Sequence, residues 1–296
     1  MSLAVATSLI KAEAFDVENF VKSKLIRNKS VKVDKVRVLS KENLKGREDW
    51  QVYMILIDAK IGKRTQTFPE ILLVNEKDKL VTMSLLDMDS GDDIAKNLKP
   101  KLSESYYDKK HLILGNPDAP NKVVVFSDPQ CPFCKEYMPK IIKDVKANPD
   151  KLALYYYHMP LLRIHPASGT ITKVMEHLQS QGKTEEALSM YKLKVSPRER
   201  NEKKILAQIK KQFNIELTPK DINTKEIKEA LKFDEQKATE MMVRGTPTVY
   251  FNGEYDKSRM KYKEVIKKDK KPQAKAKAKE TNSTKETNAT KEQNKK

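Results

Sequence analysis

Two cysteines, the only ones in this chain of 296 residues, stand with two residues between them at a boundary between a strand-like and a helical segment. They lie in SDPQCPFCKEYMPK, residues 127 to 140, as Cys131 and Cys134. The preceding segment, KVVVFS, is nearly continuously apolar, as expected for a strand buried on both faces of a sheet. The following segment, CPFCKEYMPKIIKDVKA, has a helical pattern. This order predicts an α/β domain in which the cysteine pair lies where a buried strand meets a helix.

A cysteine pair with this spacing can be a redox couple, half of a metal site or an accident of composition. A structural zinc site requires four ligands, so two histidines would have to join the cysteines. The four histidines do not form the required short pair, and each is interpreted as structural or exposed. They are His111, His158, His165 and His177. We therefore predict no metal site and no cofactor.

The redox interpretation fits the position of the pair. Cys131 would lie at the N-terminus of a helix, where free N–H groups and the helix dipole favour the thiolate form. Cys134 would follow one turn later on the same face, where it could attack a mixed disulfide formed at Cys131. Pro132 suits the first helical turn, because the N–H group that it lacks would have no partner there. An acid three residues before the pair, Asp128, could relay a proton but is more often a turn or cap residue.

A second motif, VRGTPTVYF (residues 243 to 251), places a proline at the start of an apolar strand. A proline inside a sheet domain needs a structural reason, and a cis Thr246–Pro247 bond facing the cysteines would be one. Between the two motifs, the pattern predicts a strand over 152–160 and then four helical segments. Asn252-Gly253 after the second motif is a hairpin signal, and a last helix is expected near 261–268.

These segments resemble the thioredoxin-fold Dsb proteins of the bacterial periplasm. The resemblance covers about 111 to 265 and is carried by NPDAPNKVVVFSDPQCPFCKEYMPKI, YYYHMPLLRIHPAS, QGKTEEALSMY and RGTPTVYFNG. It implies a thioredoxin-like fold with a helical insertion at about 159–242.

Carried over residue by residue, the resemblance gives each motif residue a role. Cys131 would be the attacking cysteine and Cys134 the resolving one, and the two would form the redox-active disulfide. Pro132 and Phe133 would tune the couple. Thr246 and Pro247 would line a groove in which an extended substrate pairs with the backbone.

The N-terminal part has a different pattern. A helical face over 16–26 precedes four strand-like runs, several of which alternate apolar and polar residues, so one buried face is expected. Residues 15–88 are predicted to form a small α+β domain, which looks like the cystatin-like dimerisation module of the DsbC/DsbG type in layout but not in motif. Residues 89–110 are predicted to be a linker helix. The insertion looks closer to the oxidase DsbA, so oxidase and isomerase both stay open.

Charge and composition indicate the character of the surface and of the two terminal segments. The net charge is +18, of which +7 lies from Lys267 onward. The lysines are not gathered around an aromatic platform, so a solvated surface and no nucleic-acid partner are expected. Residues 1–14 are interpreted as the remnant of an export signal. The polar, lysine-rich segment 266–296 is predicted to be disordered, and Asn282 and Asn288 lie in acidic N-x-S/T sequons that suggest glycosylation in a periplasm.

Together these observations predict a periplasmic, homodimeric thiol:disulfide oxidoreductase. Its partners would be unfolded or misoxidised exported proteins and a membrane redox partner. The alternative is a dimeric chaperone or binding module that keeps the fold but is redox-silent.

Overall fold

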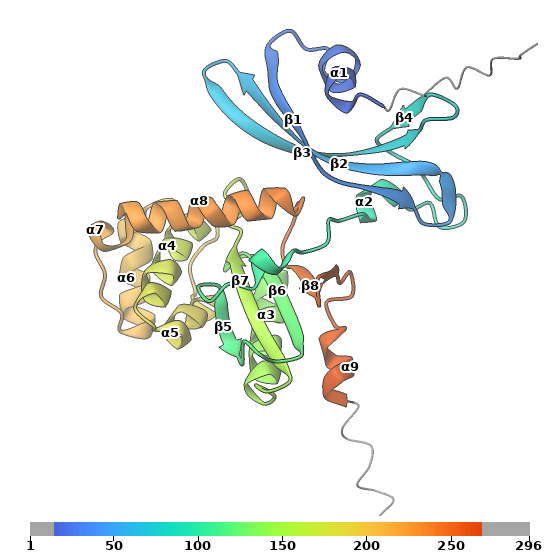
Figure 1. Ribbon diagram of the computed structural model, residues 1–296. Helices are drawn as coiled ribbons and strands as arrows, with labels where there is room; N and C mark the ends of the chain where they lie inside the picture. Colours follow the sequence, from blue (N-terminus) through green and yellow to red (C-terminus); the bar gives the residue numbers. More distant parts are fainter. Residues whose placement is uncertain (1–14, 268–296) are drawn as a thin grey trace, which may run out of the picture. The chain divides into compact units, whose positions relative to one another are not determined.

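The computed structural model describes residues 15–267, which form two compact units (Figure 1). The N-terminal unit comprises 15–100 with 239–242, and the C-terminal unit comprises 101–238 with 243–267. The predicted signal remnant, nearly all of the predicted tail, and the sequons at Asn282 and Asn288 lie outside the described residues. No helix within 15–267 is long and apolar enough to cross a membrane.

The N-terminal unit is built on an antiparallel meander with the strand order β1-β2-β3-β4. The first three strands are long, and two-residue turns at 45–46 and 62–63 connect them, so that pairing continues through polar residues up to each turn. Gly46 and Gly62 adopt positive φ angles of 76° and 60° in these turns, a conformation that costs glycine little. The strands are β1 (Val31–Leu44), β2 (Arg47–Ile61), β3 (Arg64–Asn75) and β4 (Leu80–Thr82).

Both faces of this sheet are covered, so the expectation of one buried face is wrong. All six residues from Val52 to Ile57 in the central strand β2 are buried. On one face, α1 (Val17–Phe20) and the π-helical turn η1 (Val21–Leu25) contribute Val17 and Val21 to an apolar cluster. On the other face, Ala95 and Met242 join residues of β2 and β3 in a second cluster.

The predicted linker helix over 89–110 is not formed as one element. The structure contains only α2 (Ile94–Asn97) and the 3-10 turn η2 (Glu104–Tyr106) in this range. The helix ends at Leu98, which has an extended backbone with φ −76° and ψ 140°. Pro100 prevents the helix from resuming directly after Leu98, because a proline disfavours the helical conformation of the residue before it, here Lys99.

The C-terminal unit contains a five-stranded sheet in the order β5-β7-β6-β8-β9. β6 and β7 are parallel, and the other neighbouring pairs are antiparallel. Strand β7 is buried at every residue, including the run Tyr155-Tyr156-Tyr157, and β6 is buried from Val123 onward. The strands are β5 (Leu112–Gly115), β6 (Asn121–Ser127), β7 (Leu152–His158), β8 (Thr248–Phe251) and β9 (Glu254–Tyr255).

Helices fill the connections of this sheet. Helix α3 (Pro132–Lys146) joins β6 to β7, as predicted, and α9 (Tyr262–Lys267) follows the Asn252-Gly253 hairpin. The predicted insertion between β7 and β8 is helical, and it ends the first of its helices beside Gly182, whose φ is 74°. Its helices are α4 (Ala167–Ser180), α5 (Thr184–Ser189), the 3-10 turn η3 (Met190–Lys192), α6 (Glu202–Phe213), α7 (Pro219–Ile222) and α8 (Lys225–Glu240). Mixed α/β architecture is therefore confirmed, whereas the cystatin-like likeness of the N-terminal unit stays a prediction.

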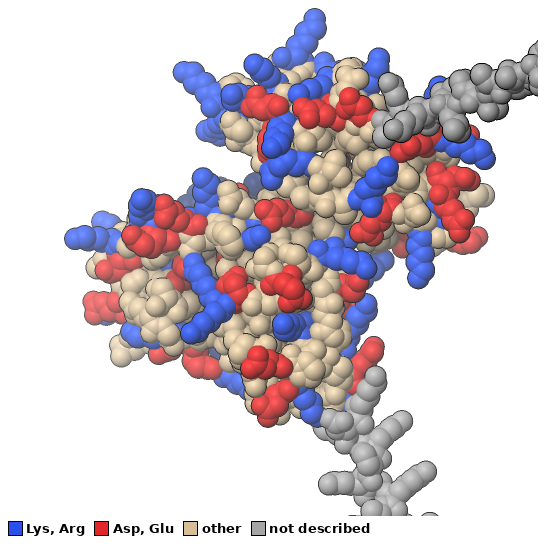
Figure 2. Space-filling view, in the orientation of Figure 1, with Lys and Arg blue, Asp and Glu red and all other residues tan. Residues whose placement is uncertain are grey.

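Charged side chains are mixed on the surface of each unit. On the face shown in Figure 2, Lys and Arg side chains alternate with Asp and Glu and do not form one continuous basic patch. Several of these side chains pair locally, for example Lys140 with Glu136 at 2.7 Å. Such pairs are typical of a solvated surface and contribute little to stability.

Candidate active site

Cys131 lies in the short connection from strand β6 to helix α3. It is the N-cap residue of α3, with an extended backbone of φ −67° and ψ 124°, and Pro132 is the first helical residue. Its backbone is fixed on both sides, because its N–H donates to Asp128 O at 3.2 Å and its carbonyl accepts from Lys135 N at 2.9 Å. The strand and helix thus place the sulfur at the positive end of the helix dipole.

The two sequence motifs meet at this sulfur. Cys131 Sγ lies 3.3 Å from Thr246 O, and the Thr246–Pro247 peptide bond is cis, as predicted. The 115 residues that separate Cys131 from Thr246 along the chain are bridged because β6 and β8 are neighbours. The Thr246 hydroxyl is buried and has no hydrogen-bond partner in the described part of the chain.

The surroundings of the two sulfurs separate their acidities. The pKa of Cys131 is lowered to about 5, and a hydrogen bond from the Cys134 side chain is the largest cause. Burial acts in the opposite direction and raises this pKa. The Thr246 side chain and the N–H groups of Cys134 and Phe133 lower this pKa further. Burial and the hydrogen bond to Cys131 raise the pKa of Cys134. Cys131 is therefore the thiolate and Cys134 the thiol, which is the division of roles expected from the motif.

The two thiols are free in this structure, so it shows the dithiol and not the predicted disulfide. Both sulfurs are largely enclosed: Cys131 is 4% exposed and Cys134 is fully buried. Phe133 between them is 65% exposed. The motif therefore presents an apolar ring to solvent beside a sulfur that is accessible over a small area.

Asp128 is a turn residue, as the sequence suggests, and it also positions the loop next to the motif through long-range hydrogen bonds that the sequence does not indicate. Its carboxylate is fully buried, and it accepts hydrogen bonds from Gln130 N at 2.7 Å and Leu161 N at 2.8 Å. It also accepts from His165 Nδ1 at 2.9 Å and from the Ser168 hydroxyl. One side chain therefore ties the Cys131 loop to the start of the helical insertion. The HPAS segment supplies two of these donors, and it could have been matched to a buried acid.

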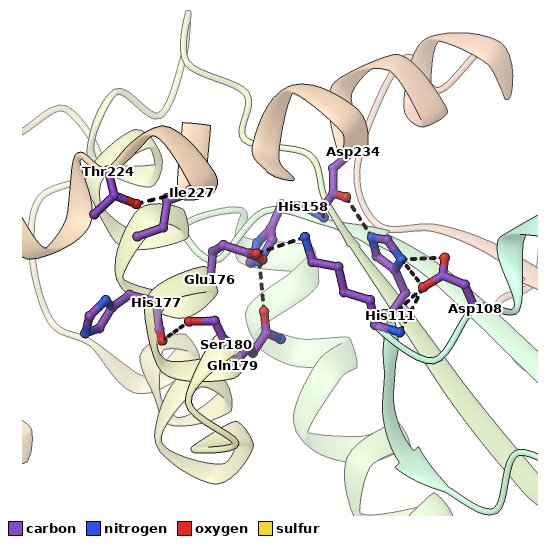
Figure 3. A network of polar contacts seen from close by, with 11 residues as sticks. Asp108, His111, His158, Glu176, His177, Gln179, Ser180, Thr224, Ile227 and Asp234 are labelled. Atoms are coloured by element: carbon purple, nitrogen blue, oxygen red, sulfur yellow. Dashed lines mark hydrogen bonds and ion pairs between the residues drawn. The ribbon is translucent and has the colours of Figure 1, made fainter. Parts of the chain in front are cut away.

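A second buried polar network lies around His111, at the start of β5 (Figure 3). His111 Nδ1 contacts Asp108 Oδ2 at 2.7 Å, and His111 Nε2 contacts Asp234 Oδ1 on α8 at 2.9 Å. Burial alone would lower the pKa of His111, but the hydrogen bonds to Asp234 and Asp108 raise it. The other oxygen of Asp234 accepts from His158 N at 2.8 Å.

This network fastens helix α8 of the insertion to the sheet. It explains why two of the histidines are buried, and it agrees with their structural interpretation. Within residues 15–267, no group of three or more His, Cys, Asp or Glu side chains is arranged to hold a metal ion.

Comparisons with known proteins agree with this geometry. The sequence model of a family described as Thioredoxin matches residues 107–268. The "Probable disulfide bond formation protein D" of Bacillus anthracis is 28% identical over 170 residues, which cover 54% of this chain and 78% of that protein. The protein of the same description in Bacillus cereus is 27% identical over 172 residues, with the same coverage.

Two solved structures are similar to more than half of this chain. The similarity to the crystal structure of oxidised BdbD from Bacillus subtilis covers 59% of this chain and 96% of the BdbD chain, with 20% sequence identity and a TM-score of 0.45. The similarity to the crystal structure of a thioredoxin-like oxidoreductase from Silicibacter pomeroyi covers 57% of this chain and 98% of that protein's chain, with 21% sequence identity and a TM-score of 0.46.

Proposed function

Because this chain belongs to the thioredoxin family, we propose that it is a thiol:disulfide oxidoreductase whose chemistry is carried out by Cys131 and Cys134. The observation that carries the proposal is the sulfur of Cys131, whose pKa is lowered to about 5 at a helix N-terminus and beside cis Pro247. A sulfur in this state is a thiolate at neutral pH and hence a nucleophile. The names of the two Bacillus relatives, disulfide bond formation proteins, support the same reaction class.

The residues carry the reaction in two exchanges. In the oxidising direction, a substrate thiolate attacks Cys131 Sγ of the Cys131–Cys134 disulfide, and Cys134 leaves as a thiolate. A second substrate thiol then gives its proton to Cys134, and its sulfur attacks the substrate sulfur that is bonded to Cys131. Cys131 leaves as a thiolate, so the substrate loses two electrons and gains a disulfide, while the protein gains the dithiol. The reducing direction runs through the same atoms in reverse.

The substrate would bind beside Cys131. Thr246 and Pro247 precede strand β8, and the backbone there can pair with an extended peptide. The exposed ring of Phe133 offers an apolar contact to the same peptide. Pro132 fixes the helix start, so that Pro132 and Phe133 tune the couple through the position of the N–H donors and not through a charge of their own.

The substrates that we propose are unfolded or misoxidised exported proteins in the periplasm, with a membrane protein as redox partner. Disulfides persist in such oxidising compartments, which supports this location for an enzyme that makes or exchanges them. The direction of net reaction depends on which state of the couple the cell maintains. An oxidase requires the Cys131–Cys134 disulfide, whereas an isomerase requires the Cys131 thiolate.

Homodimerisation through the N-terminal unit is part of the proposal. Strand β1 is an edge strand of 14 residues, and its Val38 and Leu39 are 50% and 38% exposed. An unpaired edge with apolar side chains is suited to association with a second chain. The same surface would serve the alternative function, a redox-silent chaperone or binding module.

A redox titration against glutathione separates the two functions. An oxidoreductase is expected to show a two-electron couple of Cys131 and Cys134 between roughly −300 and −100 mV. A chain with no titratable couple in this range would support the binding module instead. Alkylation trapping of the protein from intact cells then distinguishes an oxidase, trapped as the disulfide, from an isomerase, trapped as the dithiol.

A further inference from the structure

Within residues 15–267, one pocket of the C-terminal unit is lined by three arginines and by no acidic residue. Its volume is about 340 Å³, so it can admit the side chain of one amino acid. The arginines are exposed and come from two loops, one between β7 and α4 and the other between η3 and α6. The residues that line this arginine pocket are Arg163, Ile164, Pro166, Arg198 and Arg200.

The two loops are held together by their backbones. Ala167 N, at the start of α4, donates to Pro197 O at 3.0 Å. Ala167 follows Arg163 by four residues, and Pro197 directly precedes Arg198. The hydrogen bond therefore fixes the spacing of the two segments, and the pocket does not depend on the flexible side chains alone.

The first of these loops is also fastened to the Cys131 loop. The buried carboxylate of Asp128 accepts from Leu161 N at 2.8 Å and from His165 Nδ1 at 2.9 Å. Arg163 lies midway between these two anchors in the sequence. The carbonyl of Asp128 in turn accepts from Cys131 N at 3.2 Å. Since each residue of an extended chain spans about 3.3 Å, a peptide whose cysteine is bonded to Cys131 can reach the pocket within several residues.

The acids nearest to the arginines in the sequence are engaged elsewhere. Glu199 Oε1 accepts from the backbone N–H groups of Arg200 at 2.9 Å and of Asn201 at 2.8 Å. Glu202 Oε2 pairs with Lys173 Nζ at 3.1 Å. The three guanidinium groups form no ion pair within residues 15–267. Their like charges repel one another around the pocket, and an anion that enters would relieve this repulsion.

A carboxylate side chain fits this pocket in both of its parts. The planar guanidinium group of arginine binds a carboxylate through two parallel hydrogen bonds. Ile164, which is 59% exposed, and Pro166 form an apolar wall beside the charges. This wall can contact the CH₂ groups of an aspartate or glutamate whose oxygens lie between the arginines.

We propose that the arginine pocket binds an acidic side chain of the polypeptide whose cysteine reacts with Cys131, so that the protein prefers substrates with an acid near the reactive cysteine. This inference rests on the proposed function and names a substrate class for it. The three arginines hold the peptide and take no part in the exchange of sulfur atoms. They should therefore raise the rate at which an acidic peptide is captured and leave other peptides unaffected.

The test uses the reduced full-length protein and peptides whose single cysteine is disulfide-bonded to nitrothiobenzoate. Cys131 attacks the peptide sulfur, the bond to the aromatic sulfur breaks, and the coloured nitrothiobenzoate leaves with the electron pair. The peptides carry Glu or Gln at one position, which is moved from about two to about six residues away from the cysteine. At the best position and low salt, the Glu peptide should react about tenfold faster, as expected for charge-assisted hydrogen bonds near the surface. This advantage should shrink in about 1 M salt.

Charge-removing variants show whether the arginine pocket causes the preference. Arg163→Gln, Arg198→Gln and Arg200→Gln, made singly and together, should reduce the Glu-to-Gln rate ratio, and the triple variant should abolish it. The rate with the Gln peptide should change less than about twofold, because the cysteines are untouched. Lys211→Gln is the matched control, since Lys211 is exposed on α6 of the same unit but lines a different pocket. Comparing ratios also cancels any effect of the glutamate on the thiol of its own peptide.

Several results would overturn the inference while the proposed function stands. One is a Glu-to-Gln ratio that is the same in the wild type and the triple variant. Another is an equal fall of the ratio in Lys211→Gln, which would indicate general electrostatic attraction. Equal slowing of both peptides in the triple variant would indicate a distorted site. Loss of binding to anionic phospholipid vesicles in that variant, with an unchanged ratio, would assign the pocket to a membrane surface.

One result reaches further. A wild-type protein that releases no nitrothiobenzoate from either peptide would overturn the proposed function and this inference together.

Discussion

The two units of this protein both bury a β-sheet on two faces, yet only one of them carries reactive groups. Every cysteine and histidine of the sequence lies between residues 111 and 177, in the C-terminal unit. The N-terminal unit has neither, but it holds most of the large apolar side chains that are exposed among the described residues: Val38, Leu39, Ile61, Leu80, Met83, Leu86 and Met88. The difference indicates that one unit performs the chemistry and the other offers surface.

The largest expected effect is the loss of disulfide exchange in the C-terminal unit, from a substitution that does not change the N-terminal unit. Cys131→Ser removes the nucleophile, so the rate of disulfide exchange with a peptide substrate should fall by more than about 10³-fold. Cys134→Ser should still form a mixed disulfide at Cys131 but should not release it, which mass spectrometry would detect. Full activity in Cys131→Ser would place the chemistry elsewhere.

Loss of a buried carboxylate in the C-terminal unit should lower the free energy of unfolding more than loss of a partly exposed carboxylate in the N-terminal unit. Asp234→Asn leaves the buried His111 ring without one of its two carboxylates and should cost about 3–5 kcal/mol of unfolding free energy. Asp58→Asn removes the partner of Arg37, whose Nε lies 3.0 Å from Asp58 Oδ2, but this pair is partly exposed and should cost about 1 kcal/mol or less.

The pH dependence of the Asp234→Asn cost has a defined sign. The pKa of His111 is raised in the folded state, so its pairing stabilises the protein fully below the unfolded value of about 6.5. This contribution is lost as pH rises through the higher folded value. The cost should therefore be larger at pH 5 than at pH 9 in chemical denaturation. Equal costs for Asp234→Asn and Asp58→Asn at pH 5 would contradict the structure.

A cavity in the N-terminal core should weaken one unit only. Ile55 on β2 is fully buried, and Ile55→Ala should cost about 3 kcal/mol in the unfolding of that unit. The alkylation rate of Cys131 should not change. Ile141→Ala is the counterpart in α3 and should destabilise the unit that holds the cysteines. A similar loss of Cys131 reactivity in both variants would mean that the units do not act separately.

The smallest expected effect concerns association. If the edge strand β1 forms the dimer, Val38→Lys should weaken dimerisation by about tenfold, as measured by sedimentation equilibrium. Met260→Lys, at a residue of the C-terminal unit that is 44% exposed, should leave the dissociation constant unchanged. A wild-type protein that sediments as a monomer at micromolar concentration would remove the dimer from the proposal.

Local patterns predict the C-terminal unit better than the N-terminal one, and the residues explain why. The buried strand ending at Ser127, the helix starting at Pro132 and the hairpin at Asn252-Gly253 each depend on a few adjacent residues. The cis bond before Pro247 is predicted only when Pro247 is paired with the distant cysteine motif. The cover on the second face of the N-terminal sheet includes Met242, nearly 200 positions after β2, which no local pattern indicates.

The partners of the buried polar groups could not be predicted for the same reason. Asp128 has the appearance of a turn residue in the sequence, and one of its donors, Gln130 N, is the local bond of such a turn. The other three donors lie within residues 161–168, a segment that only the fold brings to Asp128. The three tyrosines of β7 are buried, as expected for packing residues on a central strand. The hydrogen bond of Tyr156 to Tyr191 depends on which face of the strand each ring occupies.

The state of the Cys131 sulfur is the central claim, and the pH dependence of its alkylation tests it most directly. The reduced protein is treated with iodoacetamide between pH 3 and pH 10, and modification of Cys131 is followed by peptide mass spectrometry. Because its pKa is lowered to about 5, the thiolate should persist as pH falls from neutral, and the rate should be half-maximal near pH 5. Cys134, which is fully buried, should stay unmodified. A half-maximal rate near the ordinary thiol value of about 8.5 would contradict the account.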